Sequence, residues 1–189
     1  MISVFYRVGL YVSSFFPLYI LLVVNNYTSL SSWEKIKKIL AFENATGSAF
    51  WFMLLGLMMF SIMSLSIITN VSLSEKHEFD GISKTEDNLL DYVVTYLVPL
   101  LSIDITKLNS LLVNAGLFLL LGFIYVKNNF VYLNPLFLFF GYNIFKTSKE
   151  EIIISNFDIY DLKNMEKQRL KCRVLGYKIF LVRRQGQDS

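Results

Sequence analysis

The only histidine of the chain, His77, lies in an acidic segment between Glu75 and Glu78. An imidazole beside carboxylates is an arrangement that can bind a metal ion or relay a proton. A metal site needs several ligands held in a fixed geometry, and loop carboxylates around one histidine rarely supply them. We therefore expect a solvated surface cluster here, and we expect no metal-binding residues.

Signatures of catalysis are missing from the sequence. It contains no glycine-rich phosphate loop, no Gly-x-Ser-x-Gly nucleophile turn and no His-Glu-x-x-His motif. Cys172 is the only cysteine, so neither an intramolecular disulfide nor a multi-cysteine zinc site can form. These observations predict a protein without catalytic residues and without cofactors.

Cationic side chains alternate with apolar ones near the C-terminus, from Lys167 to Val174. On a strand, such alternation places the cations on one face. The face could be solvated, or it could contact anionic lipid headgroups, an acidic protein surface or nucleic acid. Aromatic and amide side chains that would read bases are sparse there, so we expect no direct sequence-specific binding of nucleic acid. The residues that we predict to dock a protein partner are Lys167, Arg169, Lys171, Arg173, Arg183 and Arg184.

The composition places the chain in a membrane. Hydrophobic residues make up 54% of its 189 residues and charged residues only 17%, and the mean hydropathy is +0.47. A domain of this size has too little interior to bury so much apolar surface, so the excess must face lipid. We predict an all-α polytopic membrane protein with four transmembrane helices and a small, mostly-β C-terminal cytoplasmic domain.

Apolar runs give the boundaries of this organisation. Besides the four predicted spans, an apolar stretch occupies residues 130–140. It is interrupted by Asn134 and Pro135, which favour the start of a helix. The resulting helix, about 135–140, is too short to span and should lie at the membrane interface. The predicted bundle, residues 1–141, precedes a basic β-rich domain at 142–189, and its spans are about 8–24, 49–69, 89–103 and 108–126.

Lysine and arginine placement predicts the orientation. With four spans and both ends inside, most basic residues lie on the inner side. A model with five spans and the N-terminus outside divides them equally well, so the charges leave both models open. The helix start at Asn134 favours four spans. Both models place the C-terminus in the cytoplasm.

Polar residues within the predicted spans are few. Ser61 and Ser64 lie three residues apart on one helical face, and Asn114 is an amide deep in a span. We interpret these three residues as interhelical packing positions, because hydroxyl and amide groups bond neighbouring helices in lipid. The only charge in a span is Asp91, near an end, which argues against an ion pathway. Pro17 and Pro99 should kink their helices.

The segments outside the spans also show patterns. Residues 33–40 have tryptophan, isoleucine and leucine on one helical face, which is typical of a helix on the membrane surface. In the tail, residues 142–147 and 151–157 predict a strand pair joined by a turn. Asp158 should cap a short helix, and Gly176 should allow a turn from the alternating segment into a strand at 177–182.

Three stretches of the chain carry a family resemblance. They run from Ser14 to Asn26, from Tyr96 to Asp104, and from Asn134 through Gly141 to Lys146 before the β-rich tail. In these stretches the sequence resembles the membrane subunit (KwaA) family of the bacterial Kiwa anti-phage defence system, and the resemblance covers most of the chain in order.

This resemblance implies a function. Members of that family are non-enzymatic four-span proteins that assemble as homo-oligomers, with a tetramer suspected, in the bacterial inner membrane. They work with a soluble cytosolic DNA-binding effector, and the membrane subunit is thought to sense phage attachment or injection. We therefore expect an inner-membrane sensor and scaffold subunit that contacts lipid and docks the effector. The alternative is a pore-forming or channel protein that depolarises the membrane.

Overall fold

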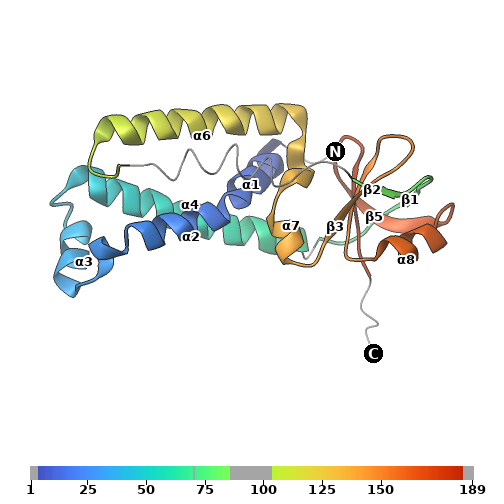
Figure 1. Cartoon of the computed structure of the whole chain (residues 1–189), viewed down its shortest axis with the longest axis horizontal. Helices are drawn as coiled ribbons and strands as arrows, with labels where there is room; N and C mark the ends of the chain where they lie inside the picture. Colours follow the sequence, from blue (N-terminus) through green and yellow to red (C-terminus); the bar gives the residue numbers. More distant parts are fainter. Residues whose placement is uncertain (1–3, 70, 86–103, 185–189) are drawn as a thin grey trace.

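The computed structural model describes residues 4–69, 71–85 and 104–184. Among them, three helical stretches are long and apolar enough to cross a membrane. They run side by side and end at a small sheet (Figure 1). The stretches are Val4–Asn25, Ala45–Ile67 and Leu108–Asn128.

The first stretch consists of two helices, α1 (Val4–Ser14) and α2 (Phe16–Asn25). The break at Phe15 precedes Pro17, which lies in the first turn of α2, where its missing N–H requires no partner. The predicted kink is therefore confirmed, and the helical stretch is longer than the predicted 8–24.

Two further predicted spans are confirmed as helices. They are α4 (Ala45–Thr69) and α6 (Leu108–Asn128), which correspond to the predicted segments 49–69 and 108–126. The predicted span 89–103 lies outside the described residues, so the count of four stays a prediction.

Short helices lie at both ends of the bundle. At the end far from the sheet, η1 (Tyr27–Leu30) leads into α3 (Trp33–Leu40), the predicted amphipathic helix. At the sheet end, η4 (Phe130–Leu133) and α7 (Leu136–Phe139) follow α6. With one turn of helix, α7 cannot cross a bilayer, so residues 130–140 do not form a fifth span.

A mixed six-stranded sheet covers the other end of the bundle. Its strand order is β1-β5-β6-β4-β3-β2, and all neighbours are antiparallel except β4 and β6. A helix, α8 (Ile159–Asn164), connects β4 to β5. The strands are β1 (Glu75–Glu78), β2 (Ser83–Lys84), β3 (Asn143–Lys146), β4 (Ile152–Ser155), β5 (Arg169–Gly176) and β6 (Ile179–Val182).

The predicted pairing of two strands in the tail is confirmed by β3 and β4. The two outer strands, β1 and β2, were not predicted, because they come from the acidic segment between two helices. The predicted C-terminal domain, which begins at residue 142, therefore lacks two of the six strands of the sheet. Their placement corrects the view of residues 75–84 as a loop of the membrane part.

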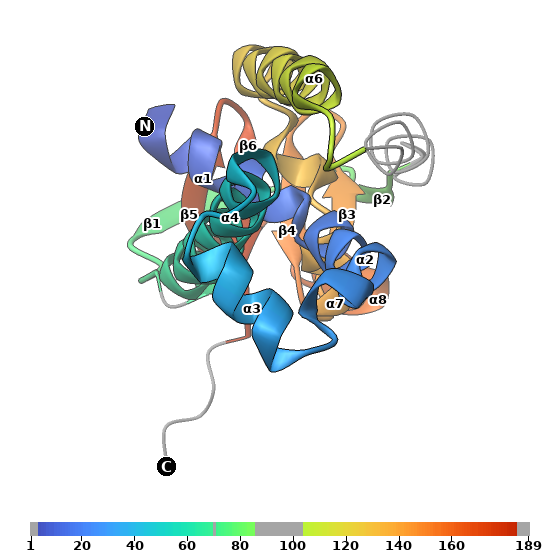
Figure 2. The same ribbon diagram turned by 90° about the vertical axis from the view of Figure 1, so that its left-hand side faces the viewer.

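The two faces of the sheet enclose different cores. One face, with Ile154 and Leu181, shares a single buried cluster with Leu10, Val131 and Phe137 of the helical part. The other face, with Ile153 and Phe180, packs against Leu162 of α8. Seen along the bundle, the sheet extends across its end and beyond it on both sides (Figure 2).

Candidate functional site

Ser61 and Ser64 lie where α4 contacts α1. The Ser61 hydroxyl is 2.7 Å from the Leu57 carbonyl oxygen of its own helix and 3.3 Å from that of Val12 in α1. A Cβ added to Gly9 would lie 2.8 Å from Ser64 Oγ, so the two helices approach closely there. Small residues at this contact let the backbones come together.

Asn114 has a different environment. Its Nδ2 donates to the Ser110 carbonyl of its own helix at 2.9 Å, and no bond to another helix involves it among the described residues. Its side chain lines a cavity of about 300 Å³ between the first stretch, α4 and α6, whose walls are otherwise almost entirely apolar. The structure thus places Asn114 beside a cavity and away from Ser61 and Ser64.

Asn134 is the amide that joins segments across the bundle, and the sequence pattern suggested only a helix cap. Its Nδ2 donates to the Leu10 carbonyl at 3.2 Å and to Ser13 Oγ at 3.0 Å. Its Oδ1 accepts from the Leu136 N–H at 3.0 Å. The side chain is fully buried, so this residue both starts α7 and fixes it to α1.

The C-terminal end of α6 is fixed to the sheet by Asn129. This residue has a left-handed backbone conformation with φ 61°, and its Nδ2 donates to the Tyr177 carbonyl at 3.1 Å. A Cβ added to Gly176 would lie 2.5 Å from Asn129 Oδ1. Glycine at the end of β5 therefore leaves room for the Asn129 side chain that makes this bond.

Two of the predicted docking residues hold the segment that follows α4. Arg173 Nη1 donates to Ser74 Oγ at 3.0 Å, and Arg183 Nη2 donates to the Val71 carbonyl at 2.9 Å. Both side chains are half-buried. They connect β5 and the end of β6 to the segment between α4 and β1.

Arg184 lies apart from them. Its guanidinium pairs with Asp161 of α8 and lies 5.3 Å from the centre of the Phe157 ring. These contacts hold the end of the chain that follows β6 against the helix on the far face of the sheet.

The remaining three cations lie at the β1 side of the sheet. Lys167 precedes β5 in a turn with φ 63°, and its N–H donates to the Phe79 carbonyl at 3.1 Å. Its predicted place on the strand is therefore wrong, because a left-handed residue interrupts the extended conformation. Arg169 and Lys171 are exposed on β5 and lie opposite Glu78 and Lys76 of β1.

The neighbours of His77 on β1, namely Glu75, Lys76 and Glu78, are exposed as expected, but the His77 ring also packs against the sheet. Its ring stacks on Phe180 at a centroid distance of 4.5 Å. Its Nε2 is 3.0 Å from Glu151 Oε1, a carboxylate that is only 10% exposed. Pairing of β1 with β5 brings the ring to this position. Among the described residues, no group of three or more His, Cys, Asp or Glu side chains could hold a metal ion.

Cys172 faces the core between the sheet and α8 and is fully buried. Burial, with a smaller contribution from the negative charge of Glu75, raises the pKa of its thiol to about 11. The thiol is therefore protonated and unreactive at neutral pH.

Comparison with known proteins gives one match. The family model described as "Anti-phage protein KwaA" matches residues 6–181, nearly the whole chain. The match confirms the family resemblance read from the sequence. No curated protein and no solved structure matches the chain.

Proposed function

Because the chain belongs to the anti-phage KwaA family, we propose that it acts in phage defence as a non-enzymatic sensor and scaffold in the bacterial inner membrane. In this proposal, the helical bundle responds to a disturbance of the envelope, and the protein assembles as a homo-oligomer, a tetramer by family resemblance. The sheet lies on the cytoplasmic side and docks a soluble DNA-binding effector.

The shared core of bundle and sheet supports a role in transmission. Leu10, Val131 and Phe137 of the helical part pack in one buried cluster with Ile154 and Leu181 of the sheet. Close-packed interiors transmit displacements, because no space is left for a local adjustment. A movement of the first helical stretch would therefore be felt in the sheet.

The pairing of β1 with β5 is the observation that carries the docking proposal. Lys76 and Lys171 are directly opposite each other, and both are exposed. Like charges at opposite positions of neighbouring strands are destabilising. Together with Lys167 and with Arg169, which lies opposite Glu78, they give this edge of the sheet an excess of positive charge that would attract an acidic surface of a partner. The docking residues of the proposal are thus Lys167, Arg169 and Lys171, with Lys76 added by the structure.

The test compares binding with stability. Lys76→Gln with Lys171→Gln removes the repulsion and the docking charges together. We expect co-purification of the co-expressed DNA-binding protein to fall at least tenfold, while the thermal stability of the membrane protein stays equal or rises. Lys163→Gln, at an exposed position on α8, is the control and should change neither. Undiminished co-purification with the double variant would show that docking occurs elsewhere.

The channel alternative predicts ion leakage from vesicles that contain this protein alone. The cavity between the first stretch, α4 and α6 is almost entirely apolar, and Asn114 and Tyr19 are the polar residues among the described residues that line it. An ion would lose its hydration there without replacement ligands. We expect vesicles with the reconstituted protein to remain tight to potassium, and leakage would favour the channel.

A further inference from the structure

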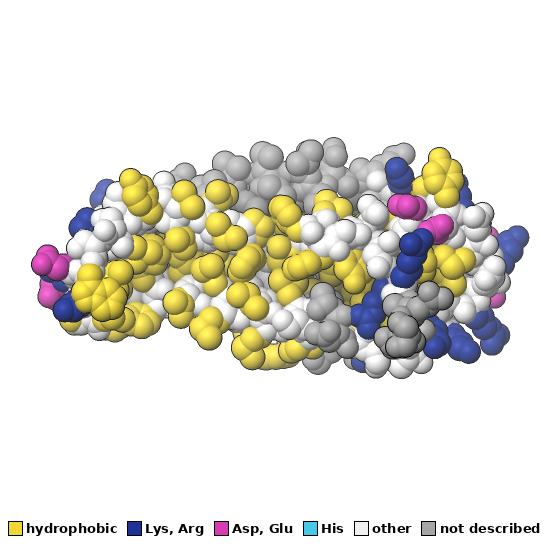
Figure 3. All heavy atoms as spheres, turned by 90° about the horizontal axis from the view of Figure 1, so that it is seen from below, with side chains coloured by type: hydrophobic (Ala, Val, Ile, Leu, Met, Phe, Trp, Pro, Cys, Tyr) yellow, Lys and Arg dark blue, Asp and Glu magenta, His cyan; other side chains and the backbone are white. Residues whose placement is uncertain are grey.

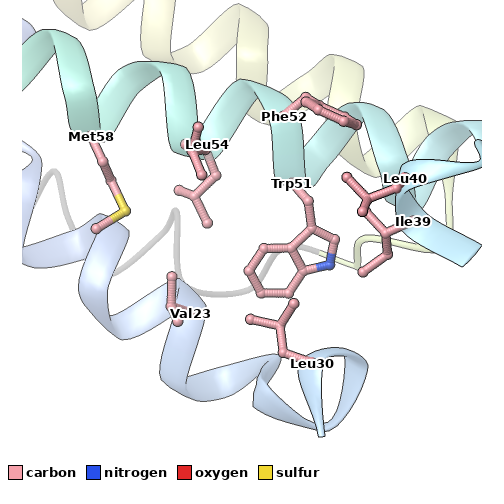
Figure 4. A pocket seen from close by; sticks show the side chains of 9 residues that line it. Val23, Leu30, Ile39, Leu40, Trp51, Phe52, Leu54 and Met58 are labelled. Atoms are coloured by element: carbon pink, nitrogen blue, oxygen red, sulfur yellow. The ribbon is translucent and has the colours of Figure 1, made fainter. Parts of the chain in front are cut away.

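Two cavities adjoin at the end of the bundle opposite the sheet. The first has a volume of about 270 Å³ and only apolar walls. Figure 4 shows its side chains converging from the end of α2, from η1, from α3 and from α4. The indole of Trp51 lies between Ile39 and Leu30 at its centre. Such a cavity suits a hydrocarbon chain.

The second cavity, the polar cavity, has a volume of about 350 Å³ and is lined by polar and charged as well as apolar residues. It shares Ile39 and Trp51 with the first. Lys35 and Lys38 of α3 and the carboxylate of Glu43 line it. Ser48 lines it as well: the residue is 1% exposed, and its Oγ has no hydrogen-bond partner among the described residues. A buried hydroxyl without a partner is costly, so it indicates that a polar group from outside completes the site.

The charges of the polar cavity favour an anion. Lys35 Nζ is held by the Thr28 carbonyl at 2.9 Å, a contact that leaves its positive charge uncompensated. Lys38 Nζ is 3.7 Å from Glu43 Oε2, in an exposed pair that neutralises little in water. Two cations against one carboxylate give a net positive charge at the mouth of an apolar cavity.

The position of the two cavities matches the depth of lipid parts. They lie where the long apolar helices end and the amphipathic α3 begins. The space-filling view shows hydrophobic side chains along the bundle, with charged side chains gathered at its ends (Figure 3). The apolar cavity therefore lies at the level of acyl chains, and the lysines lie at the level of headgroups.

We propose that this end of the bundle binds one anionic glycerophospholipid. An acyl chain fills the apolar cavity against Trp51, and the phosphate lies beside Lys35 and Lys38. A headgroup hydroxyl, as in phosphatidylglycerol, bonds Ser48. The proposal is independent of effector docking, because it concerns the opposite end of the molecule.

Tryptophan quenching by brominated lipid tests this site directly. The chain has two tryptophans, so Trp33→Phe leaves Trp51 as the only reporter. The full-length protein is placed in phosphatidylethanolamine vesicles that contain increasing fractions of phosphatidylglycerol with brominated acyl chains. The same series is run with brominated phosphatidylethanolamine. We expect half-maximal quenching at about a fivefold lower fraction of the anionic lipid, as for about one lysine contact.

Substitutions in the two cavities test which residues cause the preference for the anionic lipid. Lys35→Gln with Lys38→Gln should abolish it, whereas Lys37→Gln, on the same helix but outside both cavities, should retain it. Val23→Phe, which narrows the apolar cavity, should reduce quenching by both lipids. Equal curves for the two lipids in the parent protein, or a preference that persists without Lys35 and Lys38, would overturn the proposal.

Discussion

At the scale of residues, hydroxyl and amide donors gather around the break in the first helical stretch. Proline interrupts the regular bonding of a helix, and in lipid no water replaces the lost donors. The carbonyl of Leu10 accepts from Ser13 and Asn134, and that of Val12 accepts from Tyr19 and Ser61. Side chains of the first stretch itself and of two other segments, α4 and the start of α7, thus bond the carbonyls of α1 next to the kink.

Removal of the Asn134 amide should therefore destabilise the protein. Asn134→Ala removes one donor from the Leu10 carbonyl and removes the side-chain acceptor of the Leu136 N–H. We expect a loss of about 1–3 kcal/mol in the free energy of unfolding, the usual cost of unsatisfied buried groups. Thermal or denaturant unfolding in detergent measures it. Asn128→Ala, at an exposed position on α6, is the matched control, and equal losses for both variants would contradict the assigned role.

The thiol of Cys172 reports on the sheet. Its pKa is raised from 9.0 to about 11 by burial and by Glu75, so folding favours the protonated form. The stability that the raised pKa of this thiol contributes is fully present below about pH 9, and it is lost as the pH rises through about 11. At pH 7.5 we expect alkylation by a maleimide to be at least a hundredfold slower than in the unfolded chain. Rapid labelling of the folded protein would contradict the buried position.

At the scale of elements, glycines set the helix contacts. Gly9 of α1 lies against Ser64 of α4, and Gly122 of α6 lies against the ring of Tyr11, where an added Cβ would come within 2.8 Å in each case. The first helical stretch thus packs against both α4 and α6 through positions without side chains. Its central place explains why much of it is buried, whereas few side chains of α6 are buried among the described residues.

A pair of substitutions tests the α1–α4 contact. Gly9→Ala should lower the stability by about 1–3 kcal/mol, because its Cβ would lie 2.8 Å from Ser64 Oγ. Ser64→Ala removes that oxygen and should restore part of the loss in the double variant. Gly56→Ala, with no atom within 4 Å of the added carbon, should be neutral or slightly stabilising. Additive effects of the Gly9 and Ser64 changes would argue against direct contact.

At the scale of the whole molecule, the sheet and the bundle form one packed unit. The same end of the bundle contains the start of α1 and the ends of α4 and α6 (Figure 1). From there α4 leads into β1 and α6 leads through η4 and α7 into β3, and Asn129, Arg173 and Arg183 add hydrogen bonds. This continuity is what a protein needs if an event in the membrane is to change a surface outside it.

The junction can be weakened at one position. Gly176→Ala brings a methyl group to 2.5 Å from Asn129 Oδ1, so the Asn129 side chain must move and its bond to the Tyr177 carbonyl is disturbed. We expect the sheet to open more often, with Cys172 alkylation at least tenfold faster than in the parent protein. Gly116→Ala, where nothing lies within 4 Å, should leave the rate unchanged. If both variants react at the parent rate, the contact does not hold the sheet.

The sequence alone determined the properties that depend on neighbouring residues. Uninterrupted apolar runs gave the helices α4 and α6 to within four residues at each end. The Asn-Pro pair indicated the short helix after Asn134, and β-branched residues indicated the pairing of β3 with β4. These features are local because run length, capping and backbone preference act over a few residues.

Only the tertiary structure decided which distant segments meet. Residues 75–84 have the composition of a solvated loop, yet they form the outer strands of the sheet on either side. This pairing places Lys76 opposite Lys171 and joins His77 to Glu151, 74 positions away in the chain. Asn134 likewise bonds Leu10 across 124 positions. Local periodicity does not specify the partner of a strand or of a buried amide, because that choice depends on how the whole chain packs.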